Sequence, residues 1–356
     1  MAPVERSVPP KLVLASELPA GWDDLALRTP SPFHMQAWLD SWWSARGKGK
    51  RVVASLVAGD GELLAGASLA RSRFGALAAT ADEHSSDWDV VAVDADARNA
   101  LLGELAGLDS AVLALGPIRS PASARDAFVR AGRRAREVPG ARSPYLSLSG
   151  SFDDLLSARS SNLRSQFRRR RRALERRGEL RLRTTSQGPA LEDDLDAVLR
   201  LEASGWKARG GTAILSRPDT ERLYRGFTRA AAAKGWLRLY LLELDGVPLA
   251  GDLACAIGGE AFLVKTGFDE KLADASPGLV LRGEVLSACI DEGFRGYDFL
   301  GGPDSYKLRW TEELRPRFSV RGYRGLASAP SEAWHHALRP ALARARRRSQ
   351  TFRESR

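Results

Sequence analysis

The sequence predicts an α/β protein made of two similar halves, and three observations support this prediction. The chain has 356 residues, which is enough for two domains of ordinary size. Two segments, 51–70 and 236–255, share the pattern Asp-Gly, two variable residues and Leu-Ala-Gly. A helix-like segment that ends in glycine precedes each of them, at 37–47 and 219–235. We therefore predict a duplicated unit.

Each repeated segment is predicted to be a β-hairpin. Residues of high β-propensity flank Asp60-Gly61 in the first half and Asp245-Gly246 in the second. A two-residue type I′ turn needs a positive φ at both central positions, and Asp-Gly is well suited to this. Helix, glycine and hairpin are thus expected in the same order in both halves. A duplicated domain explains this order better than chance.

A segment rich in proline, glycine and serine, residues 139–151, separates the two halves and is expected to contain one short strand, Tyr145 to Leu148. We place the boundary near Gly150. Residues 1–150 then form an N-terminal domain and residues 151–330 a C-terminal domain. Residues 331–356 form a basic tail, which we expect to begin as a peripheral helix.

Composition narrows the class of protein. The hydrophobic fraction of 44% is ordinary for a globular protein, and no apolar run approaches the ~20 residues that span a bilayer. The cysteines, Cys255 and Cys289, are too few for a disulfide framework and fit a reducing compartment. The four histidines show no metal-ligand spacing. We expect a cytoplasmic protein without a metal centre, which at most lies peripherally at a membrane.

The chain carries a net charge of +10, which favours an anionic partner. Much of the excess lies within residues 153–177, which we expect to form one helix. Its apolar residues form one stripe: Leu156, Leu163, Phe167 and Leu174. Nine arginines lie between Arg159 and Arg177 against a single acid, Glu175. Two interpretations stay open. The segment Arg164–Arg177 is either a solvated face or a contact surface for a polyphosphate, RNA or anionic lipid.

The segment 260–293 has the pattern of an anion site. Residues 261–269 are expected to form a strand, and a helix is expected from Leu279 to Glu292. Between them stand Ser276, Pro277 and Gly278, which suit an N-cap, a first helical position and a close backbone approach to a ligand. Free N–H groups at a helix N-terminus bind anions. Capping alone also explains the serine and the proline.

Two charged residues lie inside predicted strands, where burial is costly unless they are paired. Asp298 is either a structural hydrogen-bond hub or a functional carboxylate. Lys265 lies in the strand 261–269, and alternation places it on the same face as Gly267 and Asp269. We therefore expect Lys265 and Asp269 to line one cleft, where partial burial would shift their pKa values towards those of a base or an electrostatic stabiliser.

With these motifs in order, the second half resembles a family of acetyltransferases in the GNAT superfamily. This family includes CelD-like cellulose-biosynthesis proteins and relatives of the FemAB peptidyltransferases. The motifs that carry the resemblance are Asn162-Leu163-Arg164, Glu202 with Gly205-Trp206-Lys207, Lys265 with Asp269, Ser276-Pro277-Gly278, Tyr297-Asp298-Phe299, Gly301 and Tyr306-Lys307 with Trp310. The N-terminal pattern Pro32-Phe33, Trp38 and Trp42-Trp43 is similar to the opening of this family, so that the resemblance covers most of 20–325.

The resemblance implies two tandem GNAT-like domains, each with a mixed, strongly bent sheet that splays open between its fourth and fifth strands. Here those strands are 260–268 and 295–300. An acyl thioester, acetyl-CoA or another acyl-CoA, would enter the splay. Its pyrophosphate would lie on the residues from Ser276 through Pro277 and Gly278 to Leu279. A strand N–H near Thr266 and Gly267 would polarise its carbonyl group.

The resemblance also implies direct attack by an amine or hydroxyl of a small-molecule or glycan acceptor, in cell-envelope or polysaccharide metabolism. On this basis we assign the base to Asp298 or Asp269, with Lys265 as the third catalytic residue. The residues expected to hold substrate are Trp206, Lys207, Tyr306 and Lys307. Only Ser276-Pro277-Gly278 stands where GNAT enzymes usually have Arg/Gln-x-x-Gly-x-Gly/Ala. An acyl carrier protein or an aminoacyl-tRNA therefore stays open as the donor.

The first half lacks such a loop, since residues 82–90 read DEHSSDWDV. We expect it to be non-catalytic and to supply one wall of the substrate cleft. His84, Ser85 and Asp87 are the residue types of a hydrolase triad, but close sequence neighbours rarely reach its geometry. Two other functions stay open: an RNA- or polyanion-binding protein without catalysis, and an inactive scaffold in a membrane-associated complex.

Overall fold

The computed structural model describes residues 9–204 and 213–335, and their strands form one mixed sheet. Thirteen strands take part in the described ranges, in the order β1-β2-β3-β4-β6-β13-β7-β12-β11-β10-β9-β8, with β5 paired to β3. The strands are β1 (Lys11–Ala15), β2 (Lys50–Val57), β3 (Leu63–Arg71), β4 (Leu77–Ala79), β5 (Val91–Ala92), β6 (Val112–Ile118), β7 (Arg134–Ser147), β8 (Leu180–Thr185), β9 (Leu237–Leu244), β10 (Val247–Ile257), β11 (Glu260–Phe268), β12 (Gly296–Asp298) and β13 (Leu314–Tyr323).

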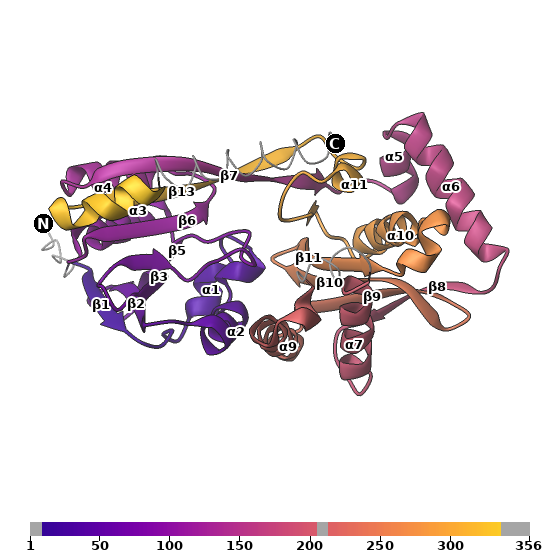
Figure 1. Ribbon diagram of the computed structural model, residues 1–356, viewed down its shortest axis with the longest axis horizontal. Coiled ribbons are helices and arrows are strands. Elements are labelled where there is room, and N and C mark those ends of the chain that lie inside the picture. The colour runs from indigo at the N-terminus through magenta and orange to yellow at the C-terminus, as the bar shows by residue number, and fades with distance from the viewer. Residues whose placement is uncertain (1–8, 205–212, 336–356) are drawn as a thin grey trace, which may run out of the picture.

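The helices cover this sheet in two lobes, which β7 and β13 join in Figure 1. They are α1 (Trp22–Ala26), α2 (Gln36–Arg46), α3 (Ala95–Gly107), α4 (Ala122–Arg130), α5 (Phe152–Ser157), α6 (Ser161–Glu175), α7 (Leu191–Glu202), α9 (Pro218–Ala233), α10 (Pro277–Asp291), α11 (Ser305–Leu308) and α12 (Ala329–Ala333). No helix in the described ranges is both long and apolar enough to cross a bilayer.

The expected repeat is present. In the first half α2 leads to the hairpin β2–β3, then to β4, α3 and β6, and β4 pairs with β6 in parallel. In the second half α9 leads to the hairpin β9–β10, then to β11, α10 and β12, and β11 pairs with β12 in parallel. The two leading helices pack against each other, with the ring of Trp38 on those of Tyr224 and Phe227. One hydrophobic core therefore belongs to both halves.

The two hairpins differ in their turns. Strand pairing in the second hairpin runs to Leu244 and Val247, so that Asp245 (φ 50°) and Gly246 (φ 78°) form the predicted two-residue turn. In the first, pairing ends at Val57 and Leu63, and a five-residue loop joins the strands. The predicted type I′ turn is wrong there, because Asp60 turns its carboxylate onto the N–H of Glu62 within the longer loop.

The proline-rich segment 139–151 is not the irregular connection between the two halves that its composition predicts. Most of it lies in β7, a strand of fourteen residues that pairs with β13 from Arg134 to Pro144 and with β12 at its end. Tertiary pairing overrides the local turn signals because β13 returns to the first half and lies between β6 and β7. The domain boundary near Gly150 stays a prediction, and the strand 314–323 belongs to the sheet of the first half.

The arginine-rich segment forms two helices rather than one. Helix α5 ends at Ser157, and Ser160 caps α6 by accepting a hydrogen bond from the N–H of Leu163. The predicted stripe is nevertheless buried, with Leu156 on the first helix. On the second, Phe167 packs against Gly283 of α10, where an added Cβ would lie 2.1 Å from the ring. This contact fixes α6 firmly to the second lobe.

Replacing Gly283 with alanine is expected to lower the free energy of unfolding by about 1–3 kcal/mol, because the new methyl group would overlap the Phe167 ring. Gly103→Ala in α3 is the matched control, since nothing lies within 4 Å of the position that its added methyl group would take. That change is expected to stabilise by about 0.5–1 kcal/mol through helix propensity. Urea unfolding measures both. Equal stability of Gly283→Ala and the wild type would contradict the packing.

Candidate active site

Strands β11 and β12 part after three paired residues. The pairs are Glu260 with Gly296, Ala261 with Tyr297 and Phe262 with Asp298. Beyond them β11 continues to Phe268 along β10, whereas the other strand ends in a turn. The expected splay between these strands is therefore present.

A cleft of about 550 Å³ opens where the strands part, and both halves of the chain line it. Helix α7 and its end, the parted length of β11, and the turn and helix after β12 contribute most of its wall. The first half contributes the remainder from one loop. The lining residues are Glu83, His84, Ser86, Leu201, Glu202, Ser204, Leu263, Val264, Lys265, Thr266, Gly267, Phe268, Glu270, Phe299, Leu300, Gly301, Gly302, Asp304, Tyr306 and Lys307.

The predicted donor-binding residues of the strand, Thr266 and Gly267, lie in the cleft wall. Gly267 is required by packing, because a Cβ there would come within 2.4 Å of the backbone of Leu201 and Glu202 at the end of α7. Strand and helix thus touch directly. This close approach holds the parted end of β11 in place beside the cleft.

Lys265 lines the cleft as predicted, but Asp269 does not. A bulge at Val264 shifts the register against β10, so that Val264 packs into the core shared by both halves and Lys265 follows on the same side. The Lys265 Nζ lies 5.2 Å from the centre of the Tyr224 ring. Burial lowers the pKa of Lys265, although Glu202, Asp82 and Glu83 oppose this. Asp269 instead accepts a hydrogen bond from the N–H of Lys271 and caps the short helix Glu270–Ala275.

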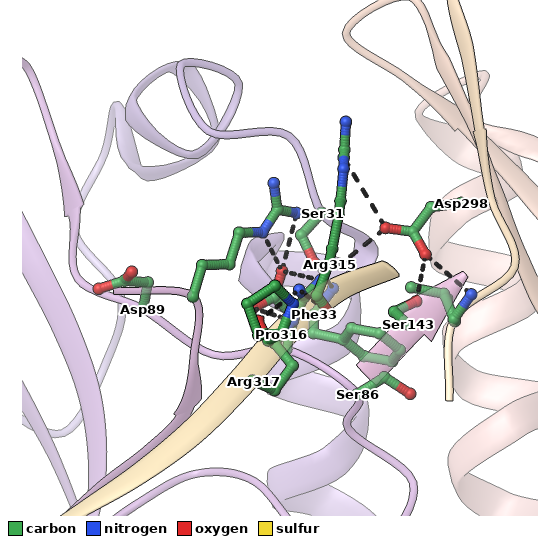
Figure 2. Close-up of polar contacts among 12 residues, drawn as sticks. Ser31, Phe33, Ser86, Asp89, Ser143, Asp298, Arg315, Pro316 and Arg317 are labelled. Carbon is green, nitrogen blue, oxygen red and sulfur yellow. Dashed lines mark hydrogen bonds and ion pairs between the residues drawn. The ribbon is translucent and has the colours of Figure 1, made fainter. Parts of the chain in front are cut away.

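Asp298 is fully buried behind the cleft rather than in its lining. Its Oδ1 accepts hydrogen bonds from the Ser143 hydroxyl (2.6 Å) and from the N–H of Leu300 (2.8 Å). Its Oδ2 lies 3.9 Å from Arg315 Nη1 and 3.8 Å from Arg317 Nη2. Figure 2 shows these side chains converging on Asp298 from the neighbouring strands. Of the two interpretations of Asp298, this geometry fits the structural hub.

The hub extends into the first half. Asp87 is buried, accepts a hydrogen bond from Arg119 Nη2 (2.9 Å) and lies 3.3 Å from Arg317 Nε. Burial alone would raise the pKa of Asp87, but the surrounding positive charges lower it. The Ser86 hydroxyl next to it accepts a hydrogen bond from the N–H of Gly301 in the cleft wall. The turn after β12 is therefore held from both halves.

Lys307 and Tyr306 both line the cleft, but Lys307 is already bound within the protein. Its Nζ donates to the carbonyl oxygens of Leu300 (2.9 Å) and Gly302 (3.1 Å) and pairs with Asp304 (2.9 Å). Burial lowers the pKa of Lys307 and raises the pKa of Tyr306. Lys307 therefore fixes the turn after β12, whose Leu300 has a φ of 50°. Trp206 and Lys207, also predicted to hold substrate, lie outside the described residues.

Helix α10 begins at the far end of the parted strand. Ser276 occupies the predicted N-cap position in a left-handed conformation (φ 52°), but its side chain makes no capping hydrogen bond. Pro277 follows at the first helical position, and Leu279 donates its N–H to the Ser276 carbonyl. Gly278 faces Phe268 of the cleft, and a Cβ added at this glycine would lie 3.4 Å from the ring. Within residues 9–204 and 213–335, no side chain caps the start of this helix.

The corresponding helix of the first half, α3, has a side-chain cap at its N-terminus. Asp94 caps α3 with its carboxylate, which accepts a hydrogen bond from the N–H of Ala97 (2.8 Å). A fixed carboxylate at this place would repel an anionic ligand. The two copies of the unit thus differ at the same structural position.

Sequence reasoning missed the contribution of His84. It lines the cleft, and its Nδ1 lies 3.2 Å from the Tyr224 hydroxyl. Burial and the charge of Lys265 lower the pKa of His84. No local pattern identifies this residue, because only the contact between the two halves brings it to the second site.

Removing the hub carboxylate is expected to destabilise the fold. Asp298→Ala should lower the free energy of unfolding by about 3–5 kcal/mol, because the buried Arg317 would lose a counter-charge. Asp291→Ala on the exposed end of α10 is the matched control and should stay within about 0.5 kcal/mol of the wild type. Chemical unfolding followed by circular dichroism tests this, and similar small losses in both variants would argue against the hub.

Comparison with known proteins agrees with this architecture. Residues 161–308 match the family model described as acetyltransferase (GNAT) domain. No curated protein matches the chain in sequence. The solved structure of FemX is similar over 90% of this chain and 99% of its own, at 13% identity and a TM-score of 0.60. The C-terminal domain of a putative lysylphosphatidylglycerol synthetase from Agrobacterium fabrum is similar over 87% of this chain and 92% of its own, at 16% identity and a TM-score of 0.56.

These likenesses extend the fold over both halves, and the family match lies on the half that contains the parted strands and the uncapped helix start. Residues 161–308 thus match a GNAT acetyltransferase domain, and the structural likenesses show a common fold over both halves of the chain.

Proposed function

We propose that the second half transfers an acyl group from a thioester donor, acetyl-CoA or another acyl-CoA, to an amine or hydroxyl of a small molecule or glycan. The main support is a single juxtaposition: β11 and β12 part beside a helix start that has no side-chain cap. A ligand in the parted strands would reach that helix start past Phe268.

The donor would lie along β11. Its phosphate groups bind at Ser276 to Leu279, where the N-terminal end of α10 offers a favourable field and Gly278 leaves room. Its thioester lies near Thr266 and Gly267, on the length of β11 beyond its pairing with β12, where a strand N–H would polarise the carbonyl group.

The first half acts as a wall of the cleft and does not bind a second donor. Two observations support this part of the proposal. Glu83, His84 and Ser86 line the cleft from the first half. In addition, the Asp94 carboxylate occupies the helix start that a second donor would need.

Asp298 and Asp269 act on the backbone and do not take a proton from the acceptor. Asp298 holds the turn at Leu300, and Asp269 caps the helix that follows β11. Neither carboxylate lines the cleft, whereas a general base must come within hydrogen-bond reach of the attacking group. Tyr306 and Lys307 shape the pocket, and the roles predicted for Trp206 and Lys207 stay predictions.

Aminoacyl transfer is the alternative chemistry for the same cleft. The fold-level likeness to FemX and to a lysylphosphatidylglycerol synthetase domain favours it, and so does the exposed basic face of α6. Arg164, Arg168, Arg169, Arg172 and Arg176 line a shallow depression of about 540 Å³ on that face. Such a surface suits a polyanion, including an RNA that carries a donor. A cytoplasmic protein in cell-envelope or polysaccharide metabolism is consistent with either chemistry.

Donor binding is tested by Gly278→Asp. The added carboxylate would repel phosphate at the helix start, while its Cβ meets the Phe268 ring at an ordinary contact distance. At ~100 times its dissociation constant, acetyl-CoA should stabilise the wild type by about 2.7 kcal/mol in a thermal-shift titration, and the variant should lose this shift. Gly103→Asp, on an exposed face of α3, is the control and should keep it. A full shift in Gly278→Asp would refute the donor site.

The polyanion surface is tested with tRNA. Changing Arg168, Arg172 and Arg176 to glutamine should lower the affinity and reduce the slope of log K against log salt by about 2–3, because each lost phosphate contact removes ~0.7–0.9. The control changes the exposed Arg73, Arg125 and Arg130 of the first half to glutamine, which removes the same net charge. If both triple variants lose the same affinity, the effect is one of net charge and the face is ordinary solvated surface.

A further inference from the structure

Lys265 is a charged group in the cleft that lacks a counter-charge. Its Nζ makes no hydrogen bond and no ion pair within 4 Å among the described residues; its close contact is the Tyr224 ring at 5.2 Å. Burial lowers the pKa of Lys265, with Glu202, Asp82 and Glu83 as the acids that oppose the shift from a distance. The side chain is half-buried, so the ammonium group is incompletely hydrated, and a bound anion would compensate its charge.

The acidic residues that line the cleft do not act as the counter-charge of Lys265, because each of them contacts another group. Glu83 pairs with Arg46 at 3.0 Å, and Asp304 pairs with Lys307 at 2.9 Å. Glu202 accepts a hydrogen bond from the N–H of Ile214 and, like Glu270, has a further partner. His84, on the facing loop, lies within hydrogen-bond distance of the Tyr224 hydroxyl. The unmatched charge in the cleft is therefore positive.

The donor phosphates are not expected to bind at Lys265. Their proposed site at Gly278 lies against Phe268, three residues or ~10 Å farther along β11. Lys265 also faces Tyr224 and the loop of the first half, on the other side of the strand from α10. The anion must then belong to the molecule that enters from the first-half side.

We propose that Lys265 binds a carboxylate or phosphate of the acceptor, so that the acceptor is an anionic molecule whose amine or hydroxyl lies close to its acidic group. This inference rests on the proposed function, in which the donor occupies the Gly278 end of the cleft. The bound anion turns the nucleophile towards the thioester near Thr266. A C–N or C–O bond forms, the C–S bond breaks with its electron pair on sulfur, and the thiolate takes up the proton that the nucleophile loses.

Competitive labelling of the wild-type protein tests the site directly. Trace acetic anhydride modifies unprotonated lysines, and peptide mass spectrometry compares Lys265 with the exposed Lys271 in each sample. The probes are two matched pairs, glycine with glycinamide and O-phosphoethanolamine with ethanolamine. An anion at Lys265 keeps its amine protonated and covered. We expect at least threefold protection of Lys265 by one acidic member and none by its neutral partner.

Protection by glycine would identify the bound group as a carboxylate, and protection by O-phosphoethanolamine would identify it as a phosphate. Equal labelling of Lys265 with all four probes overturns the anion site. Equal protection by an acid and its neutral partner also overturns it, since recognition would then not depend on the anion.

Two variants separate anion binding from proton transfer by Lys265. Thiol release from acetyl-CoA is measured with the protecting acceptor for the wild type, Lys265→Met, Lys265→Arg and the control Lys271→Met. For an anion site, Lys265→Met raises the KM for the acceptor at least tenfold, while Lys265→Arg, which keeps the charge, stays within about threefold of the wild type. A loss of kcat in both variants with unchanged KM assigns Lys265 as a base and overturns the inference.

The same measurements distinguish the two proposals. Protection of Lys265 without any thiol release by the wild type would leave the anion site standing and refute the acyltransferase proposal for acetyl-CoA. Thiol release that treats the acidic and neutral acceptors alike, in the wild type and in Lys265→Met, would leave the acyltransferase standing and refute the anion site.

Discussion

The cleft depends on one buried carboxylate, that of Asp298. Strand β12 must end where β11 continues, and the chain turns there through Leu300 in a left-handed conformation that a branched side chain rarely adopts. Asp298 holds that turn by its N–H and anchors it to Ser143 and, through ion pairs, to Arg315 and Arg317. In a low-dielectric interior such a network is strong only when it is complete. The turn that ends β12 is therefore held by residues of the first half and of β13.

The two copies of the repeated unit differ at the residue that precedes the helix. Both units place a helix start beside the parting of parallel strands. In the first unit a carboxylate, Asp94, satisfies the helix N-terminus from within. In the second, Ser276 adopts a conformation that directs its side chain away from this task. A helix start can be stabilised by its own side chain or can bind a ligand, and this difference is why the donor site is proposed in the second unit alone.

Local patterns predicted the features that depend on local chemistry. The second hairpin, the helix from Pro277 and the splay between 260–268 and 295–300 follow from turn residues, capping residues and motif order, the last by resemblance. Features set by distant contacts could not be predicted in this way. Strand β7 runs through a proline-rich segment because β13 returns to pair with it, and Asp269 leaves the cleft to cap the helix after β11. His84 reaches the cleft only because the two halves share a core.

The two lysines of the cleft, Lys265 and Lys307, differ in the partners of their ammonium groups. Lys265 is predicted to be catalytic and Lys307 to hold substrate, and burial lowers the pKa of both. Lys307 has two carbonyl oxygens and Asp304 around its ammonium group, so a ligand that displaced them would have to replace three interactions. Lys265 has the Tyr224 ring at 5.2 Å and, among the described residues, no hydrogen-bond or ion-pair partner, so a ligand anion there would displace no such partner and gain a charge-assisted contact. An anion that binds Lys265 therefore gains more free energy than one that binds Lys307, whose ammonium group already has partners in the protein. For this reason we assign selection of the acceptor to Lys265.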